Sequence, residues 1–109
     1  LILNTYSGGI SSVSQSTHVA KDHELFQNFP NPFNPSTNIK FTLASVSEVR
    51  LSVWTLLGSH IIDLINENLN EGSYEIEFDA GKYRLSSGVY YYTLSSGNFR
   101  QTRKFILLK

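Results

Sequence analysis

Residues 85–94 read Leu-Ser-Ser-Gly-Val-Tyr-Tyr-Tyr-Thr-Leu, and we interpret this stretch as the central strand of the fold. The turn-forming Ser-Ser-Gly leads directly into six residues that are mostly β-branched or aromatic, which is typical of a β-strand. Alternate residues of a strand point to opposite faces: Tyr90, Tyr92 and Leu94 to one, and Val89, Tyr91 and Thr93 to the other. The pattern leaves open which face is buried, and we expect the rest of the chain to pack around this strand.

Tyr90 follows Gly88 by two residues, at the start of the predicted strand. The same placement occurs in the tyrosine corner of immunoglobulin-like sandwiches, where the hydroxyl bonds to the backbone a few residues upstream. We therefore expect Tyr90 to have a structural role.

Further strand candidates lie on both sides of this stretch. Apolar and polar residues alternate in three of them, and two others are less regular; together they cover residues 39–43, 49–53, 60–65, 74–79 and 99–109. We expect residues 66–72 to form a polar loop. The continuous apolar run 105–108 indicates either a strand covered on both faces or a β-bulge.

The whole chain offers six or seven short strands and no sustained helical periodicity. This pattern predicts an all-β fold, an immunoglobulin-like antiparallel β-sandwich of about seven strands. A chain of 109 residues suits a single domain of this kind.

A proline-rich segment precedes the first regular strand candidate. Residues 26–37 contain all three prolines of the chain, and proline excludes both a helix and a central strand. We predict an extended lead-in whose asparagines close local turns. We expect three phenylalanines to hold this lead-in against the sandwich: Phe26, Phe29 and Phe33.

Residues 1–24 carry little periodic pattern, and we interpret them as the end of a preceding unit followed by a linker. The domain itself is predicted to cover residues 25–109. The missing initiator Met suggests a fragment of a larger polypeptide. No apolar run approaches the roughly 20 residues that a membrane-spanning helix needs, so we expect no membrane span.

The chain has no net charge, which argues against nucleic acid as a partner, and it has no cysteine, which excludes disulfides and thiolate metal sites. The charges are unevenly placed, because residues 48–79 are acidic and residues 99–109 are basic. We expect both stretches to form solvated strand faces; a partner-binding role for the basic tail is the alternative.

We predict no catalytic, metal-binding or cofactor-binding residues. His18, His23 and His60 lack zinc-ligand spacing, and the carboxylates of Glu75, Glu77 and Asp79 are expected on the solvent face of one strand. No phosphate-binding glycine loop or serine nucleophile motif is present. Trp54 and Tyr91 leave open an exposed aromatic platform for sugars or bases, although a lone Trp more often covers the edge of a core.

Several segments resemble, in order and spacing, the type A C-terminal sorting domain of type IX secretion (Por system) substrates. The resemblance covers about residues 25–109 and rests on residues 26–39, 49–53, 56–58, 78–80, 85–90 and 102–109. Trp54-Thr55 and Ser59-His60 depart from the usual family pattern, which weakens any claim about a shared contact surface at that hairpin.

The resemblance implies a secreted, cell-surface protein of a Bacteroidetes-type bacterium. It implies an outer-membrane translocon, a shuttle protein and a sortase as partners of the domain, with cleavage in the linker before Phe26 and a passenger domain on the N-terminal side. Carried over by position, the family's sorting-motif residues are Pro30, Pro32, Gly88, Tyr90, Lys104, Phe105, Ile106, Leu107, Leu108 and Lys109.

We consider two functions, of which the resemblance implies the first. The first is a sorting signal without enzymatic activity, whose last strand has an unpaired edge that docks by strand addition. The alternative is an immunoglobulin-like adhesion or carbohydrate-binding module, since fold alone does not fix function.

Overall fold

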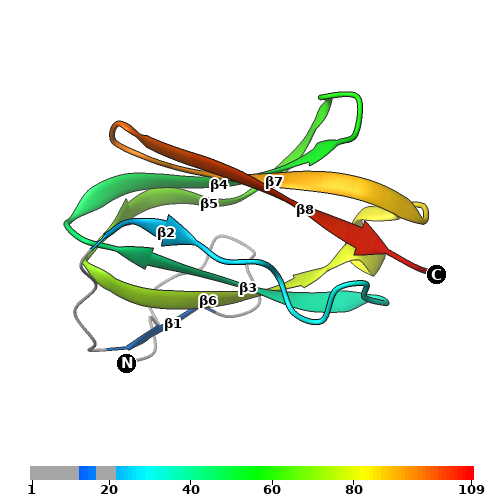
Figure 1. The fold of residues 1–109 in the computed structure, drawn as a ribbon, viewed down its shortest axis with the longest axis horizontal. Coiled ribbons are helices and arrows are strands. Elements are labelled where there is room, and N and C mark those ends of the chain that lie inside the picture. Colours follow the sequence, from blue (N-terminus) through cyan, green and yellow to red (C-terminus); the bar gives the residue numbers. More distant parts are fainter. Residues whose placement is uncertain (1–12, 17–21) are drawn as a thin grey trace.

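In a computed structural model of the protein, which describes residues 13–16 and 22–109, the chain forms a β-sandwich (Figure 1). The all-β prediction is thus confirmed. One short 3-10 helix, Ala80–Tyr83, joins two of the strands. The strands are β1 (Val13–Ser16), β2 (Glu24–Leu25), β3 (Ser36–Leu43), β4 (Ser47–Thr55), β5 (His60–Leu69), β6 (Gly72–Asp79), β7 (Gly88–Ser96) and β8 (Phe99–Leu107).

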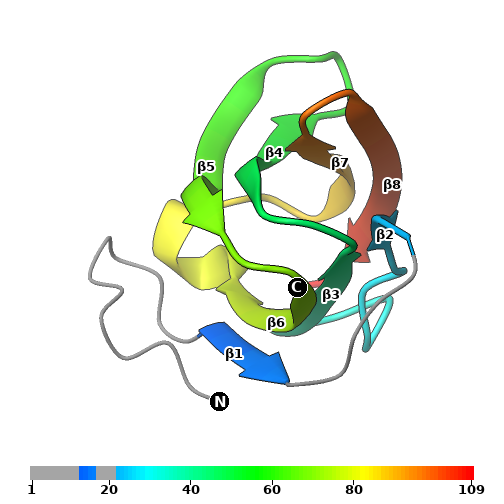
Figure 2. The ribbon, with the colours of Figure 1, turned by 90° about the vertical axis from the view of Figure 1, so that its left-hand side faces the viewer.

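The strands form two antiparallel four-stranded sheets that pack face to face. The first sheet has the order β1-β6-β3-β2, and the second has the order β5-β4-β7-β8. Figure 1 shows them as two layers, and the end-on view in Figure 2 places β2 of the first sheet beside β8 of the second. The strand quoted at the outset, β7, lies between β4 and β8.

The core fills the space between the sheets, as the alternating patterns predict. On β7 the buried face is the one with Tyr90, Tyr92 and Leu94, which resolves the choice that the sequence left open. The other strands add their apolar phase: Ile39, Phe41, Leu43, Val49, Leu51, Val53, Tyr74, Ile76 and Phe78. Burial of alternate residues from two sheets provides most of the driving force for such a fold.

The prediction of a polar loop over residues 66–72 is wrong, because β5 continues to Leu69 and only two residues separate it from β6. The register between β4 and β5 shifts twice, between Leu51 and Ser52 and between Val53 and Trp54. Such β-bulges break simple alternation, so Leu64 and Ile65 are buried although they are neighbours. This irregularity hid the true length of the strand.

The proline-rich lead-in crosses from one sheet to the other. Phe26 and Phe29 bond to β3 in the first sheet, whereas Phe33 bonds to β8 in the second. Of the three phenylalanines expected to anchor the lead-in, only Phe33 does so, with 3% of its surface exposed. The expectation was wrong for Phe26 and Phe29, which are 36% and 78% exposed.

The residues predicted to form the preceding unit and linker are only partly described. Residues 13–16 form β1 on the edge of β6, and Glu24 begins β2, which pairs with β3. Most of residues 1–24, His18 among them, lies outside the described residues. The domain boundary at residue 25 remains a prediction.

Candidate functional site

The end of β8 is bonded to the lead-in, and this contact is the centre of the candidate site. The backbone N–H of Phe33 donates to the carbonyl oxygen of Ile106, and the N–H of Leu108 donates to the carbonyl oxygen of Phe33, both at 3.0 Å. The N–H of Ile106 donates to Oδ1 of Asn31 at 2.9 Å. Phe33 and Leu107 therefore form a short parallel bridge at the outer edge of the second sheet.

Side chains extend this clamp along β8. Nε2 of Gln27 donates to the carbonyl oxygen of Lys104 at 2.6 Å, and Nε of Arg103 donates to the carbonyl oxygen of Leu25 at 2.6 Å. The expectation that the last strand has an unpaired edge is therefore wrong for residues 104–108. Strand addition at this part of β8 would first have to displace the lead-in.

The Gly-x-Tyr segment meets the same end of β8. Gly88 pairs with Leu107. Gly88 has φ +155°, a conformation that side-chain-bearing residues rarely adopt, which explains glycine at the start of β7. The hydroxyl of Tyr90 donates to the carbonyl oxygen of Ser86 at 2.7 Å, which confirms the tyrosine corner.

A second corner of the same kind was missed in the sequence. Tyr74 also follows a glycine by two residues, and its hydroxyl donates to the carbonyl oxygen of Asn70 at 2.6 Å. The repeated Gly-x-Tyr spacing was the available signal.

Phe105 joins these segments inside the core. Its ring stacks on Tyr90 with centroids 5.5 Å apart and meets Phe33 edge-on at 5.0 Å. Phe78 of β6 lies 5.5 Å from the same ring. The lead-in, the Gly-x-Tyr turn and the last strand thus share one aromatic cluster.

The structure brings the sorting-motif residues together at one end of the sandwich and divides them into two groups. Phe105, Leu107 and Tyr90 are buried, and they have a structural role. Ile106 is half-buried and Leu108 is 54% exposed. The other exposed motif residues are Pro30, Pro32, Lys104 and Lys109. A role of these residues in sorting remains a prediction.

The exposed side of β8 continues across the second sheet in a single row. Lys104 pairs with Tyr91, Tyr91 with Trp54, and Trp54 with His60. Trp54 is half-buried, and its ring meets that of His60 edge-on with centroids 5.0 Å apart. Its position is compatible with both roles considered for a lone tryptophan, a partly exposed aromatic surface and a cover over the sheet.

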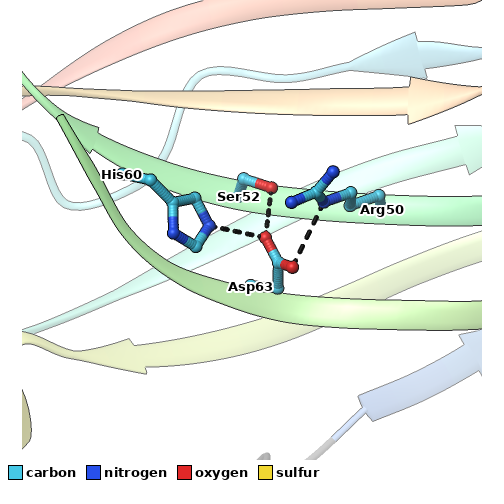
Figure 3. A network of polar contacts seen from close by, with 4 residues as sticks. All are labelled: Arg50, Ser52, His60 and Asp63. Carbon is cyan, nitrogen blue, oxygen red and sulfur yellow. Dashed lines mark hydrogen bonds and ion pairs between the residues drawn. The ribbon is translucent and has the colours of Figure 1, made fainter. Parts of the chain in front are cut away.

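Next to this row, Asp63 accepts three side-chain bonds (Figure 3). Ser52 donates to Oδ1 at 2.6 Å, Nε2 of His60 lies 2.8 Å from the same oxygen, and Nε of Arg50 lies 3.2 Å from Oδ2. Burial alone raises the pKa of Asp63, but the bonds from Ser52, His60 and Arg50 outweigh it and lower the pKa to about 2.

This network braces the bulged part of β5 against β4. The hydroxyl of Ser52 bonds to the carboxylate of Asp63, and His60 bonds to that same carboxylate. In a nucleophile–base pair the imidazole instead accepts the serine proton. The arrangement of the three side chains therefore differs from that of a catalytic triad.

Two further candidates for chemistry, His23 and Asp79, have structural partners. Nδ1 of His23 accepts the N–H of Ala44 at 3.0 Å. Oδ1 of Asp79 accepts the N–H of Gly81 at 2.9 Å and caps the short helix. Across residues 22–109 and β1, no group of three or more His, Asp or Glu side chains is placed to hold a metal ion.

A hollow of about 460 Å³ lies between the lead-in and the first sheet. It is lined by the two exposed phenylalanines and by polar residues of the lead-in and the sheet: Phe26, Gln27, Phe29, Asn38, Lys40 and Glu75.

No helix in the described part of the chain is long and apolar enough to cross a membrane.

Comparison with known proteins identifies the family. No curated protein matches the chain. A family model described as the secretion system C-terminal sorting domain matches residues 27–108, which include the lead-in, β7 and nearly all of the clamped tail. Because this match covers most of the chain, the chain belongs to the type IX secretion C-terminal sorting domain family.

Proposed function

We propose that this sorting domain acts as a folded address label that the outer-membrane translocon and its shuttle protein recognise on the exposed side of the last strand. A C-terminal sorting signal for type IX secretion is established by the family match, which favours it over an adhesion or carbohydrate-binding module. The particular partners, the surface attachment of the passenger and the lack of enzymatic activity are parts of the proposal.

The clamp on β8 is the observation that carries the proposal. Bonds from Asn31 and Phe33 fix the backbone of Ile106 and Leu108, so the side chains of the tail are presented in one arrangement. A preorganised binding segment loses less conformational entropy when it binds. Recognition of a fixed surface therefore suits this tail better than recognition of a free strand.

The structure also supports a narrower position for sortase cleavage. Leu25 is fully buried, its N–H donates to Oε1 of Gln101, and its carbonyl oxygen accepts Arg103. A protease cannot take up a segment that is held in this way without opening the fold. We place the cleaved bond before Glu24.

The proposal is tested with a reporter that carries an export signal and is fused in front of the complete chain, in a host with a type IX system. Removal of residues 104–109 is expected to abolish surface delivery and leave the reporter in the periplasm. That deletion also removes two core residues, Phe105 and Leu107, and can therefore unfold the domain.

A second variant separates folding from recognition. Lys104→Ala combined with Leu108→Ala and Lys109→Ala changes exposed side chains only, so the domain should stay folded. Reduced delivery of this variant supports the proposal. Normal delivery of both variants would refute it.

A further inference from the structure

We propose that the domain docks through the outward face of the second sheet, on a patch formed by Trp54, Val89, Tyr91, Lys104, Ile106 and Leu108. We call this set the terminal-face patch. Its occupant is a protein of the type IX apparatus that presents an apolar cleft edged by carboxylates. This inference rests on the proposed function and names the surface and the contact chemistry that it uses.

The terminal-face patch is continuous because the strands are in register. Ile106 pairs with Val89, Lys104 pairs with Tyr91, and Tyr91 pairs with Trp54. Directly opposed residues on one face of a sheet have Cβ atoms about 5 Å apart. These side chains therefore form one surface over β4, β7 and β8 that includes Lys104, Ile106 and Leu108 of the sorting motif.

The patch has the composition of an interface centre. It contains Trp54, Tyr91 and three aliphatic side chains that are half-buried or exposed on an otherwise polar sheet face. Aromatic residues dominate the binding energy of many protein interfaces, and contiguous exposed apolar patches mark interaction sites. Leu56 and Leu57, 56% and 94% exposed, follow Trp54 closely in the chain, in the β4–β5 turn.

Charge on this face selects an acidic partner. Arg50 and His60 both form ion pairs with Asp63. Lys104 belongs to neither of these two pairs of the described part of the chain. Arg100 lies exposed on the same face of β8. A carboxylate on the partner would meet cations at the β8 side of the terminal-face patch.

The outward face of the second sheet carries Arg50, Arg100 and Lys104 against Glu48 and Asp63, whereas the opposite face of the sandwich has an excess of acids. The outward positions of the first sheet carry Glu24, Glu75, Glu77 and Asp79, with Lys40 as their one cation. A partner edged by carboxylates is repelled from that face and attracted to the second sheet, which orients the domain.

Docking by side chains is also consistent with the clamp. Backbone groups at the β8 edge from residue 104 onward are already hydrogen-bonded to Gln27, Asn31 and Phe33. A strand added at this edge would therefore not find these backbone groups free for pairing. The face of the strand remains accessible while its edge is covered.

The test uses the complete chain fused to the exported reporter. Tyr91→Thr and Ile106→Thr each place a β-branched residue in the strand, which suits strand geometry, and each is expected to lower surface delivery by about tenfold or more. Asn38→Thr, on the exposed face of the first sheet, is the matched control and should not change delivery. Thermal unfolding of each purified variant reports whether the domain is folded.

A photoreactive phenylalanine analogue at position 91 gives a second readout that needs no loss of function. We expect it to form an adduct with an outer-membrane protein of the type IX apparatus, and we expect no such adduct from position 77. An adduct with lipopolysaccharide alone would replace the protein partner by an anionic glycan and overturn the inference. So would normal delivery of folded Tyr91→Thr and Ile106→Thr variants.

The unmodified fusion distinguishes a failure of the proposed function from a failure of the terminal-face patch. If the unmodified fusion is not delivered, the proposed function fails and this inference fails with it. If the unmodified fusion and both patch variants are delivered equally, only the terminal-face patch is wrong.

Discussion

The hydroxyl oxygen of Tyr92 lies 2.7 Å from the backbone nitrogen of Asn28 and bonds the core of β7 to the lead-in. The same hydroxyl donates to the carbonyl oxygen of Phe26 at 2.7 Å. Asn28 is itself buried and donates through Nδ2 to Oγ1 of Thr37 at 2.9 Å. One tyrosine therefore connects the lead-in, β3 and β7 through buried polar groups.

Replacement of Tyr92 by Phe should destabilise the domain by about 2 kcal/mol, because the buried N–H of Asn28 loses its acceptor. Urea unfolding measures the change, and amide exchange at Asn28 should become faster. Tyr91→Phe is the control on the outward face and should have little effect. Unchanged exchange at Asn28 in Tyr92→Phe would contradict the assigned bond.

Phe33 and Phe29 should respond differently to the same substitution. Phe33→Ala removes a ring from the aromatic cluster and should cost about 3–5 kcal/mol. Phe29→Ala removes an exposed ring and should stay within about 0.5 kcal/mol of the parent. Chemical denaturation of both variants measures the change in the free energy of unfolding. Equal destabilisation of the two variants would contradict the assignment of Phe33 as the anchor of the lead-in.

The tyrosine corner at Tyr90 should contribute measurably on its own. Tyr90→Phe retains the stacking on Phe105 but removes the bond to Ser86, and we expect a loss of about 1 kcal/mol. Tyr83→Phe offers a comparison at a half-buried ring that stacks on Phe78. A midpoint in urea that does not shift for Tyr90→Phe would show that the corner bond contributes nothing.

Acid should weaken the domain partly through Asp63. The pKa of this carboxyl is about 2 in the folded protein and 3.8 without the fold, so its stabilising effect is present above about pH 4 and is lost as the pH falls towards 2. We expect about 1 kcal/mol, since the carboxylate is partly solvated.

Asp63→Asn removes this titration and should flatten the loss of stability between pH 4 and pH 2 in urea unfolding experiments. Glu77→Gln is the control, because Glu77 is exposed on the other sheet. The same acid dependence in the parent and in Asp63→Asn would rule out the assigned role.

The regular strands were predictable because their alternation follows directly from burial of one face. Residues 39–43, 49–53 and 74–79 follow this rule. The spacing of Gly88 and Tyr90 predicted the tyrosine corner. The bulges of β5 were not predictable, since the extra residues at a bulge depend on pairing with β4.

The clamp on the last strand was also beyond the sequence. It joins residues about 75 positions apart, such as Asn31 and Ile106, through side-chain geometry that no local pattern encodes. The exposed Phe29 was misjudged because hydrophobicity indicates burial only on average. Prediction of the terminal-face patch would have required the register of β4, β7 and β8, which sequence periodicity does not supply.

The most direct test of the account compares surface delivery of the reporter fused to the complete chain in two hosts, one with an intact type IX translocon and one without it. The account predicts surface or extracellular reporter in the first host and periplasmic reporter in the second. Equal surface delivery of the reporter in both hosts, or retention of the reporter in the periplasm of both hosts, would contradict the account.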